Sequence, residues 1–100
     1  MKTFKPGEPV RVGLNEKFEL HLPVLAAAGY QWELAEQPPG LALVRTSFQT
    51  QTGSQVGGTS QQVLRFRSVQ PGTHPLRLVC KRAWETDVAE TLTVPVSVKP

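Results

Sequence analysis

Apolar and polar residues alternate along most of this chain with a period of two. The clearest case lies near the C-terminus, where Leu92, Val94, Val96 and Val98 share one side of an extended segment. This pattern predicts a strand with one buried face. Because Pro95 has no N–H group to donate, we expect this strand to lie at a sheet edge or to carry a bulge at that residue.

Three further segments, near residues 18–22, 64–67 and 76–80, alternate in the same way. Each predicts a strand with one apolar face and one polar face. The residues expected to point inward are Phe18, Leu20, Leu22, Leu64, Phe66, Leu76, Leu78 and Cys80. The residues expected to point outward are Glu19, His21, Arg65, Arg67 and Arg77.

Turn-forming residues separate the predicted strands, with Pro-Pro-Gly at 38–40 and Pro-Gly at 71–72 as the strongest signals. No segment suits a helix of ordinary length. The number and spacing of the strands are typical of one all-β domain over residues 1–100, an immunoglobulin-like antiparallel β-sandwich of about seven strands. The strands are expected near residues 9–13, 17–23, 29–34, 42–49, 60–69, 73–82 and 88–99.

The composition of the chain excludes several classes of protein. The 100 residues carry a formal net charge of +3, from 11 Lys and Arg against 8 Asp and Glu, and they include one cysteine. A chain of this size forms one two-layer core without room for a deep cofactor cleft. One cysteine allows no internal disulfide, and no apolar stretch reaches the roughly 20 residues of a membrane span or resembles a signal peptide. We expect a soluble monomer without metal, cofactor or membrane partner, either cytoplasmic or a processed periplasmic or secreted form.

No set of residues predicts an enzyme. Cys80 would need an imidazole within hydrogen-bonding reach, but His74 lies six residues away on the same predicted strand, at about 20 Å. Cys80 is therefore expected to be a small buried apolar residue. The acidic residues Glu85, Asp87 and Glu90 are expected to form a solvated turn. We expect no catalytic residue and no metal ligand.

Phosphate and nucleic-acid binding are also not expected. The Gly-Gly-Thr segment at 57–59 lacks the lysine and the following helix of a phosphate loop. A hairpin centred on 71–72 would place Arg65 near Arg77, with Arg67 beside them, and would make one sheet face basic. Because Phe66 between these arginines points inward, that face offers no aromatic platform for bases. A solvated basic face is therefore predicted, with no nucleic-acid partner.

Three connections between the predicted strands have unusual compositions for plain turns. They are Leu-Ala-Ala-Ala-Gly at 25–29, Gly-Gly at 57–58 and Arg-Ala-Trp at 82–84. In an immunoglobulin-like sandwich, the second-to-third and sixth-to-seventh strand connections lie at the same end, and a long fourth-to-fifth strand hairpin can fold beside them. The segment 49–62, rich in Gln, Ser, Thr and Gly, is expected to form such a hairpin.

At these segments, and over roughly residues 8–99, the sequence resembles the chagasin family of inhibitors of papain-like cysteine proteases. The loop 25–29 followed by Tyr-Gln-Trp resembles the family's Asn-Pro-Thr-Thr-Gly loop, which is followed by an aromatic residue, one further residue and tryptophan. Val-Gly-Gly-Thr at 56–59 resembles the glycine-rich loop, and Arg-Ala-Trp resembles the Arg-Pro-Trp loop. The order and spacing of the three motifs agree with those of the family.

The resemblance implies a reversible inhibitor whose three loops form a wedge in the protease cleft, with the first loop over the catalytic cysteine. Gly29 would then allow close backbone approach, and Trp84 would be an aromatic anchor with Arg82 beside it. The implied partner is a papain-like cysteine protease. The implied contact residues are Leu25, Ala26, Ala27, Ala28, Gly29, Gly57, Gly58, Thr59, Arg82, Ala83 and Trp84.

Two departures from the family pattern affect these loops. Leu-Ala-Ala-Ala replaces Asn-Pro-Thr-Thr, which predicts a more apolar and less constrained first loop, and Ala83 replaces the proline of the third. We expect Trp32 in the core, Tyr30 over its end and Trp84 exposed to a partner. The alternative function is a non-inhibitory immunoglobulin-like interaction module that uses the same loops or an edge strand.

Overall fold

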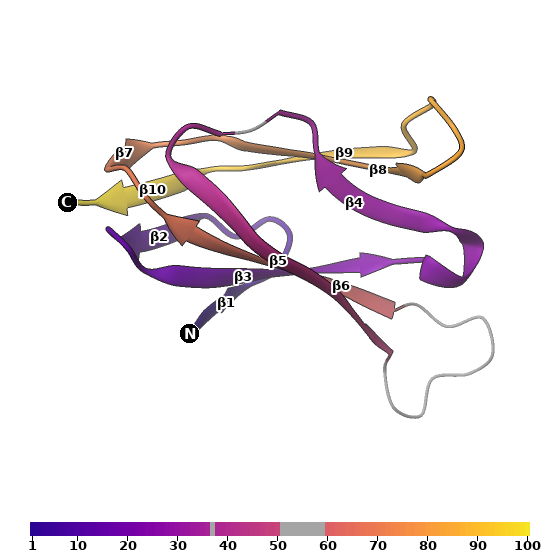
Figure 1. Cartoon of the computed structure of the whole chain (residues 1–100), viewed down its shortest axis with the longest axis horizontal. Helices are drawn as coiled ribbons and strands as arrows, with labels where there is room; N and C mark the ends of the chain where they lie inside the picture. The colour runs from indigo at the N-terminus through magenta and orange to yellow at the C-terminus, as the bar shows by residue number, and fades with distance from the viewer. Residues whose placement is uncertain (37, 51–59) are drawn as a thin grey trace.

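Ten strands and one short 3-10 turn make up the computed structural model, which describes residues 1–36, 38–50 and 60–100 (Figure 1). The prediction of an all-β chain is confirmed for these residues. The elements are β1 (Lys2–Phe4), β2 (Val10–Gly13), β3 (Lys17–Val24), η1 (Ala26–Ala28), β4 (Tyr30–Leu34), β5 (Leu41–Thr50), β6 (Ser60–Ser68), β7 (Gly72–Thr73), β8 (Leu76–Arg82), β9 (Glu90–Val94) and β10 (Val96–Lys99).

The strands form two layers. The first layer is a sheet with the order β1-β3-β6-β5, and the second combines the sheets β2-β10-β7 and β4-β8-β9 (Figure 1). Most neighbours are antiparallel, as predicted, but β1 runs parallel to β3, and β2 runs parallel to β10. The parallel pairs arise because the first strand is divided near Pro6 and Gly7, so that β1 joins the first layer and β2 joins the second.

Two prolines divide the second layer into its two sheets. The β7–β10 and β8–β9 pairs share one antiparallel register, which places Pro75 opposite Pro95. Since neither residue has an N–H group, the ladder is interrupted at this position. The edge strand predicted at Pro95 is confirmed for β9, which is the outer strand of β4-β8-β9, whereas β10 lies between β2 and β7.

The core lies between the layers and is built by the alternating residues predicted to point inward. Phe18, Leu20, Leu22, Phe66, Leu76 and Leu78 have no exposed surface, and Leu64 and Cys80 are also buried. Trp32 on β4 is 6% exposed, which confirms its predicted place in the core. The rings of Phe18 and Phe66 stack across β3 and β6, with centroids 5.5 Å apart.

The expectation that Arg65 lies near Arg77 is wrong. After β6 the chain does not turn back in the same sheet, because β7 pairs with β10 and β8 pairs with β4 and β9 in the second layer. Arg77 therefore lies in the layer opposite Arg65, where it forms an ion pair with Glu36 at 3.7 Å. The basic face of the first layer instead places Arg65 beside Arg45 of β5. In the part of the chain that is described, no helix is long and apolar enough to cross a membrane.

Candidate functional site

Two connections that are distant in sequence meet at one end of the sandwich, at the right of Figure 1. The first joins β3 to β4 and contains η1, and the second joins β8 to β9. Because β4 and β8 are adjacent antiparallel strands, with Tyr30 opposite Arg82, the two connections leave the second layer side by side. We call residues 25–29 and 82–88 together the loop end.

The segment 25–29 forms a closed 3-10 turn. The amide of Ala28 donates to the carbonyl of Leu25 at 3.1 Å, and the amide of Gly29 donates to the carbonyl of Ala26 at 3.0 Å. Gly29 ends the turn with φ 90°, a left-handed conformation that favours glycine. The turn projects Leu25, Ala27 and Ala28 into solvent, and Leu25 is 47% exposed. The three alanines thus form one tight helical turn.

Trp84 is the most exposed large apolar residue among those described, at 71%. Its six-membered ring nevertheless contacts Gly29, so closely that a β-carbon on residue 29 would overlap the ring. The indole therefore rests against the end of the 3-10 turn with most of its surface in solvent. The predicted exposure of Trp84 is confirmed, and this contact joins the two connections.

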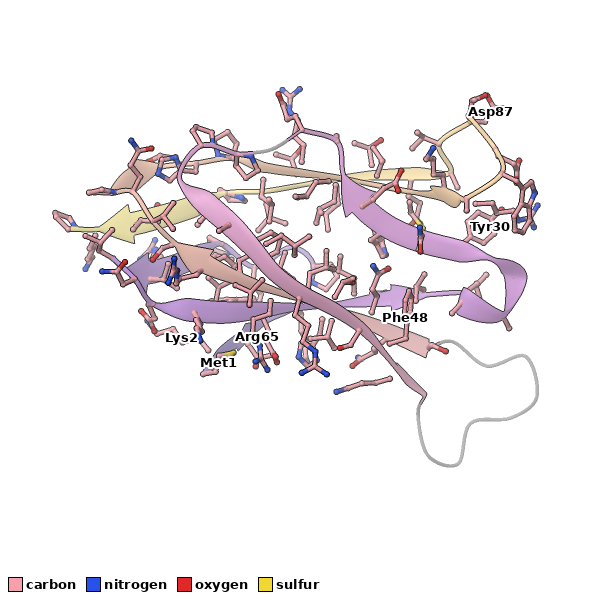
Figure 2. All side chains as sticks on the ribbon, in the orientation of Figure 1. Met1, Lys2, Tyr30, Phe48, Arg65 and Asp87 are labelled. Atoms are coloured by element: carbon pink, nitrogen blue, oxygen red, sulfur yellow. The ribbon has the colours of Figure 1, made fainter. Side chains whose placement is uncertain are left out.

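Arg82 forms a second link between the connections. Its Nε donates to the carbonyl of Ala28 at 3.1 Å, and its Nη1 binds Oε1 of Glu85 at 3.1 Å. The guanidinium also lies over the Tyr30 ring, 4.6 Å from the centroid, and 5.9 Å from that of Trp84. Figure 2 shows Tyr30 pointing toward this same end. Arg82 is thus engaged within its own chain on three sides.

These contacts constrain a loop that has no proline and no polar side chain. The alanines offer only backbone groups, and the Arg82 guanidinium binds one of them, the carbonyl of Ala28. Tyr30 also donates its amide to the carbonyl of Leu25 at 3.3 Å, which closes the base of the turn. The Tyr30 amide of β4 and the Arg82 side chain of β8 therefore hold the turn from outside, although its own sequence predicts less constraint.

A buried amide links β4, the strand that follows the first connection, to the first layer. Gln62 is 2% exposed; its Oε1 accepts from the amide of Trp32 at 2.6 Å, and its Nε2 donates to the carbonyl of Trp32 at 2.8 Å. Nε2 also donates to the hydroxyl of Thr46 at 3.2 Å. The side chain of Gln62 thus takes the place of a neighbouring strand along the edge of β4. Trp32 adds a second link between the layers, from its Nε1 to the carbonyl of Pro23 at 3.0 Å.

An open groove of about 420 Å³ lies at the root of the loop end, between the end of β3 and the start of β9. Leu25 and Tyr30 form part of its lining, and Cys80 lies at its buried side. Burial, and to a lesser extent the charge of Glu90, raise the pKa of the Cys80 thiol, so the thiol stays protonated. The two imidazoles are engaged elsewhere, His21 with Glu19 and His74 with the carbonyl of Gln70.

The structure brings together eight of the eleven predicted contact residues, those at 25–29 and 82–84. Gly57, Gly58 and Thr59 lie outside the described residues. Sequence reasoning missed Glu85, Val88 and Gln62 as parts or supports of the loop end. Gln62 shares the period-two alternation of Leu64 and Phe66, so its inward position could have been predicted. Among the described residues, no group of three or more His, Cys, Asp or Glu side chains could hold a metal ion.

Comparisons with known proteins agree with this fold. Among solved structures, the chain is similar to the cysteine protease inhibitor EhICP2 from Entamoeba histolytica, with a TM-score of 0.78 and 19% identity over 98% of this chain and 95% of that one. It is also similar to Amebosin, with a TM-score of 0.77 and 18% identity over 98% of this chain and 97% of that one. No curated protein sequence matches the chain. The family model described as chagasin family peptidase inhibitor I42 matches residues 11–98, and the chain belongs to this family of inhibitors.

Proposed function

We propose that this protein inhibits papain-like cysteine proteases reversibly, by placing the loop end in the active-site cleft. The observation that carries the proposal is the joined surface of the two connections, where Trp84 rests on Gly29 and Arg82 binds Ala28. The three large apolar side chains exposed on this surface are Leu25, Trp84 and Val88. Exposed apolar groups on a rigid support are typical of interaction sites.

The 3-10 turn explains how such a wedge would resist cleavage. A protease cleaves a peptide that lies extended in its cleft, with the scissile carbonyl open to the nucleophile. In the turn, the carbonyls of Leu25 and Ala26 accept bonds from the turn's own amides, and that of Ala28 accepts from Arg82. The segment therefore fills space without offering an extended substrate.

Constraint of the loops also favours affinity. A loop that is already ordered loses little conformational entropy on binding. Hydrogen bonds close the turn. The amide of Tyr30 and the side chain of Arg82, which lies over the Tyr30 ring, hold it against the sandwich. The segment 57–59 is proposed as the second flank of the wedge, on the strength of its glycines and its likeness to the glycine-rich loop of the family. We further propose that the protein acts as a monomer and needs no metal or cofactor.

A titration of papain and cathepsin L with the purified protein tests the proposal. We expect protease activity to fall stoichiometrically and to recover on dilution, because the complex is non-covalent. Trp84→Ala is the matched variant, since Trp84 is mostly exposed and its loss should leave the fold intact. No inhibition of any papain-like protease at micromolar protein would overturn the proposal.

That negative result would favour the alternative of a non-inhibitory interaction module. One observation supports this alternative: β5 is an edge strand, and its residues Leu43, Val44 and Phe48 are each 40–50% exposed. Edge strands readily pair with partner strands. Binding through β5 would be insensitive to Trp84→Ala but would be lost in Phe48→Lys, so the two variants separate the two functions.

A further inference from the structure

The surplus positive charge of the chain is concentrated on the outer face of the first layer. We call the outward-facing residues of β3, β5 and β6 the basic face. Pairing between the strands places Lys17 beside Arg67, and it places Glu19, Arg65 and Arg45 in one row across the three strands. Figure 2 shows Arg65 on the side of the sheet that points away from the second layer.

The charges on this face do not cancel. Lys17, Arg45, Arg65 and Arg67 are cationic, and Glu19 is the single acidic residue at an outward position of these three strands as far as they are described. This difference of three equals the formal net charge of the whole chain, so the remaining basic and acidic residues balance. Glu19 is already neutralised by Arg65, whose Nε and Nη2 bind its Oε2 at 3.0 and 2.8 Å.

A polar hollow of about 130 Å³ lies within the basic face. Its lining residues are Glu19, Arg45, Ser47, Gln49, Val63 and Arg65. Val63 forms the buried floor at 5% exposure, and the polar side chains form the walls. The guanidinium of Arg45 is exposed beside the Ser47 hydroxyl and the Gln49 amide. The hollow thus collects the guanidinium of Arg45, which is unpaired among the described residues, the Arg65–Glu19 ion pair and neutral hydrogen-bonding groups around a space large enough for one anionic group.

Two kinds of binding group follow one another along the strands of this face. The cations occupy two adjacent rows, and Ser47, Gln49 and Gln61 continue along β5 and β6 toward the loop end. Side chains two residues apart on a strand are separated by about 7 Å, and those on neighbouring strands by about 5 Å. A single linear ligand can therefore meet several cations and several amide or hydroxyl groups at once.

We propose that the basic face binds a sulfated polysaccharide. Guanidinium groups pair with sulfate oxygens in a bidentate manner, and amide and hydroxyl side chains bond sugar hydroxyls. A sulfated polysaccharide carries sulfates and hydroxyls along one chain. These groups match the guanidinium groups and the amide and hydroxyl side chains of the basic face. Single-stranded nucleic acid fits less well, since none of the outward residues described on these strands is Phe, Tyr or Trp, and the one imidazole, that of His21, is half-buried and paired with Glu19.

The proposal does not depend on protease inhibition, because the basic face covers the side of the sandwich and the loop end covers one end. The test is direct binding of a heparin oligosaccharide by calorimetry in 50 to 300 mM salt. Uncharged dextran and single-stranded DNA of equal charge serve as competing probes. The variants are Arg45→Gln and Arg67→Gln, with Arg11→Gln on β2 of the second layer as the control that removes the same charge elsewhere.

We expect heparin to bind more tightly than the DNA and dextran not to bind. Arg45→Gln and Arg67→Gln should each weaken heparin binding about tenfold and lower the slope of log affinity against log salt by about 1. Gln49→Ala should weaken heparin binding and leave DNA binding unchanged. No heparin binding at 50 mM salt, equal weakening by Arg11→Gln, or DNA binding as tight as that of heparin would each overturn the proposal.

Discussion

Trp84 and Gly29 are in direct contact, and the indole ring fills the space that a β-carbon on residue 29 would need. Gly29 also has a φ of +90°, which side chains other than glycine rarely adopt. Residue 29 is therefore restricted to glycine for two separate reasons. One reason is its own backbone, and the other is a side chain 55 residues later in the chain.

Gly29→Ala should destabilise the fold by about 1–3 kcal/mol, because the new methyl group displaces Trp84 and the left-handed backbone is strained. Inhibition should also weaken, because the indole moves. Denaturant unfolding and inhibition titrations measure the two effects. In a Trp84→Ala background the overlap is absent, so Gly29→Ala should cost less stability there than in the wild type. Additive costs in the double-mutant cycle would contradict the contact.

Trp84→Ala alone should separate binding from stability. Because the ring is 71% exposed, we expect the free energy of unfolding to change by less than about 1 kcal/mol. If Trp84 is the anchor of the loop end, inhibition should weaken by about 1–4 kcal/mol. Val69→Ala is a suitable control, since Val69 is also an exposed apolar residue but follows β6 at the opposite end of the sandwich. Equal losses in the two variants would count against a special role for Trp84.

Arg82→Lys should weaken inhibition although it keeps the charge. Lysine lacks the planar guanidinium that lies over Tyr30 while Nε binds Ala28 and Nη1 binds Glu85. We expect a loss of about 1 kcal/mol in stability and faster amide hydrogen exchange in the 25–29 turn. Arg77→Lys is the control on the same strand, since Arg77 makes an exposed ion pair with Glu36 away from the loops. Unchanged exchange in the turn would show that Arg82 does not hold it.

Gln62→Ala should be among the most destabilising changes in the described part of the chain. It leaves the amide and the carbonyl of Trp32 buried without a partner, at a cost of about 2–4 kcal/mol. Gln31→Ala is the control, because Gln31 points to the side of β4 opposite the Trp32 side chain. It should lower the free energy of unfolding by less than about 1 kcal/mol. Urea unfolding of both variants measures the difference, and similar midpoints would contradict the proposed link between the layers.

The ion pair of Glu19 predicts a loss of stability in acid. Hydrogen bonds from Arg65 and then His21 lower the pKa of Glu19 below its ordinary value of 4.5. A lowered pKa adds stability above pH 4.5, and this contribution is lost as pH falls from 4.5 through the folded-state pKa. Glu19→Gln should therefore flatten the decline of stability below pH 4.5. Urea midpoints at pH 7 and pH 3 measure this change, and parallel declines in wild type and variant would refute it.

The period-two alternation predicted the sandwich and its inward residues, because a strand with one buried face must alternate. Alternation says nothing about which sheet a strand joins, and for this reason Arg65 was expected beside Arg77 but lies beside Arg45. The crossing after β6 is decided by pairing between strands that are distant in sequence, about which the local pattern carries no information. Likewise, the link from Arg82 to Ala28 joins residues 54 positions apart and has no local signal.

Both chain ends lie away from the loop end, at the left of Figure 1. The N-terminal strand β1 runs beside β3, which carries Lys17 and Glu19 of the basic face, whereas β10 belongs to the opposite layer. A linker attached after Pro100 would therefore leave both the loop end and the basic face accessible. Two copies joined in this way could bind two proteases at once, with an avidity set by the length of the linker.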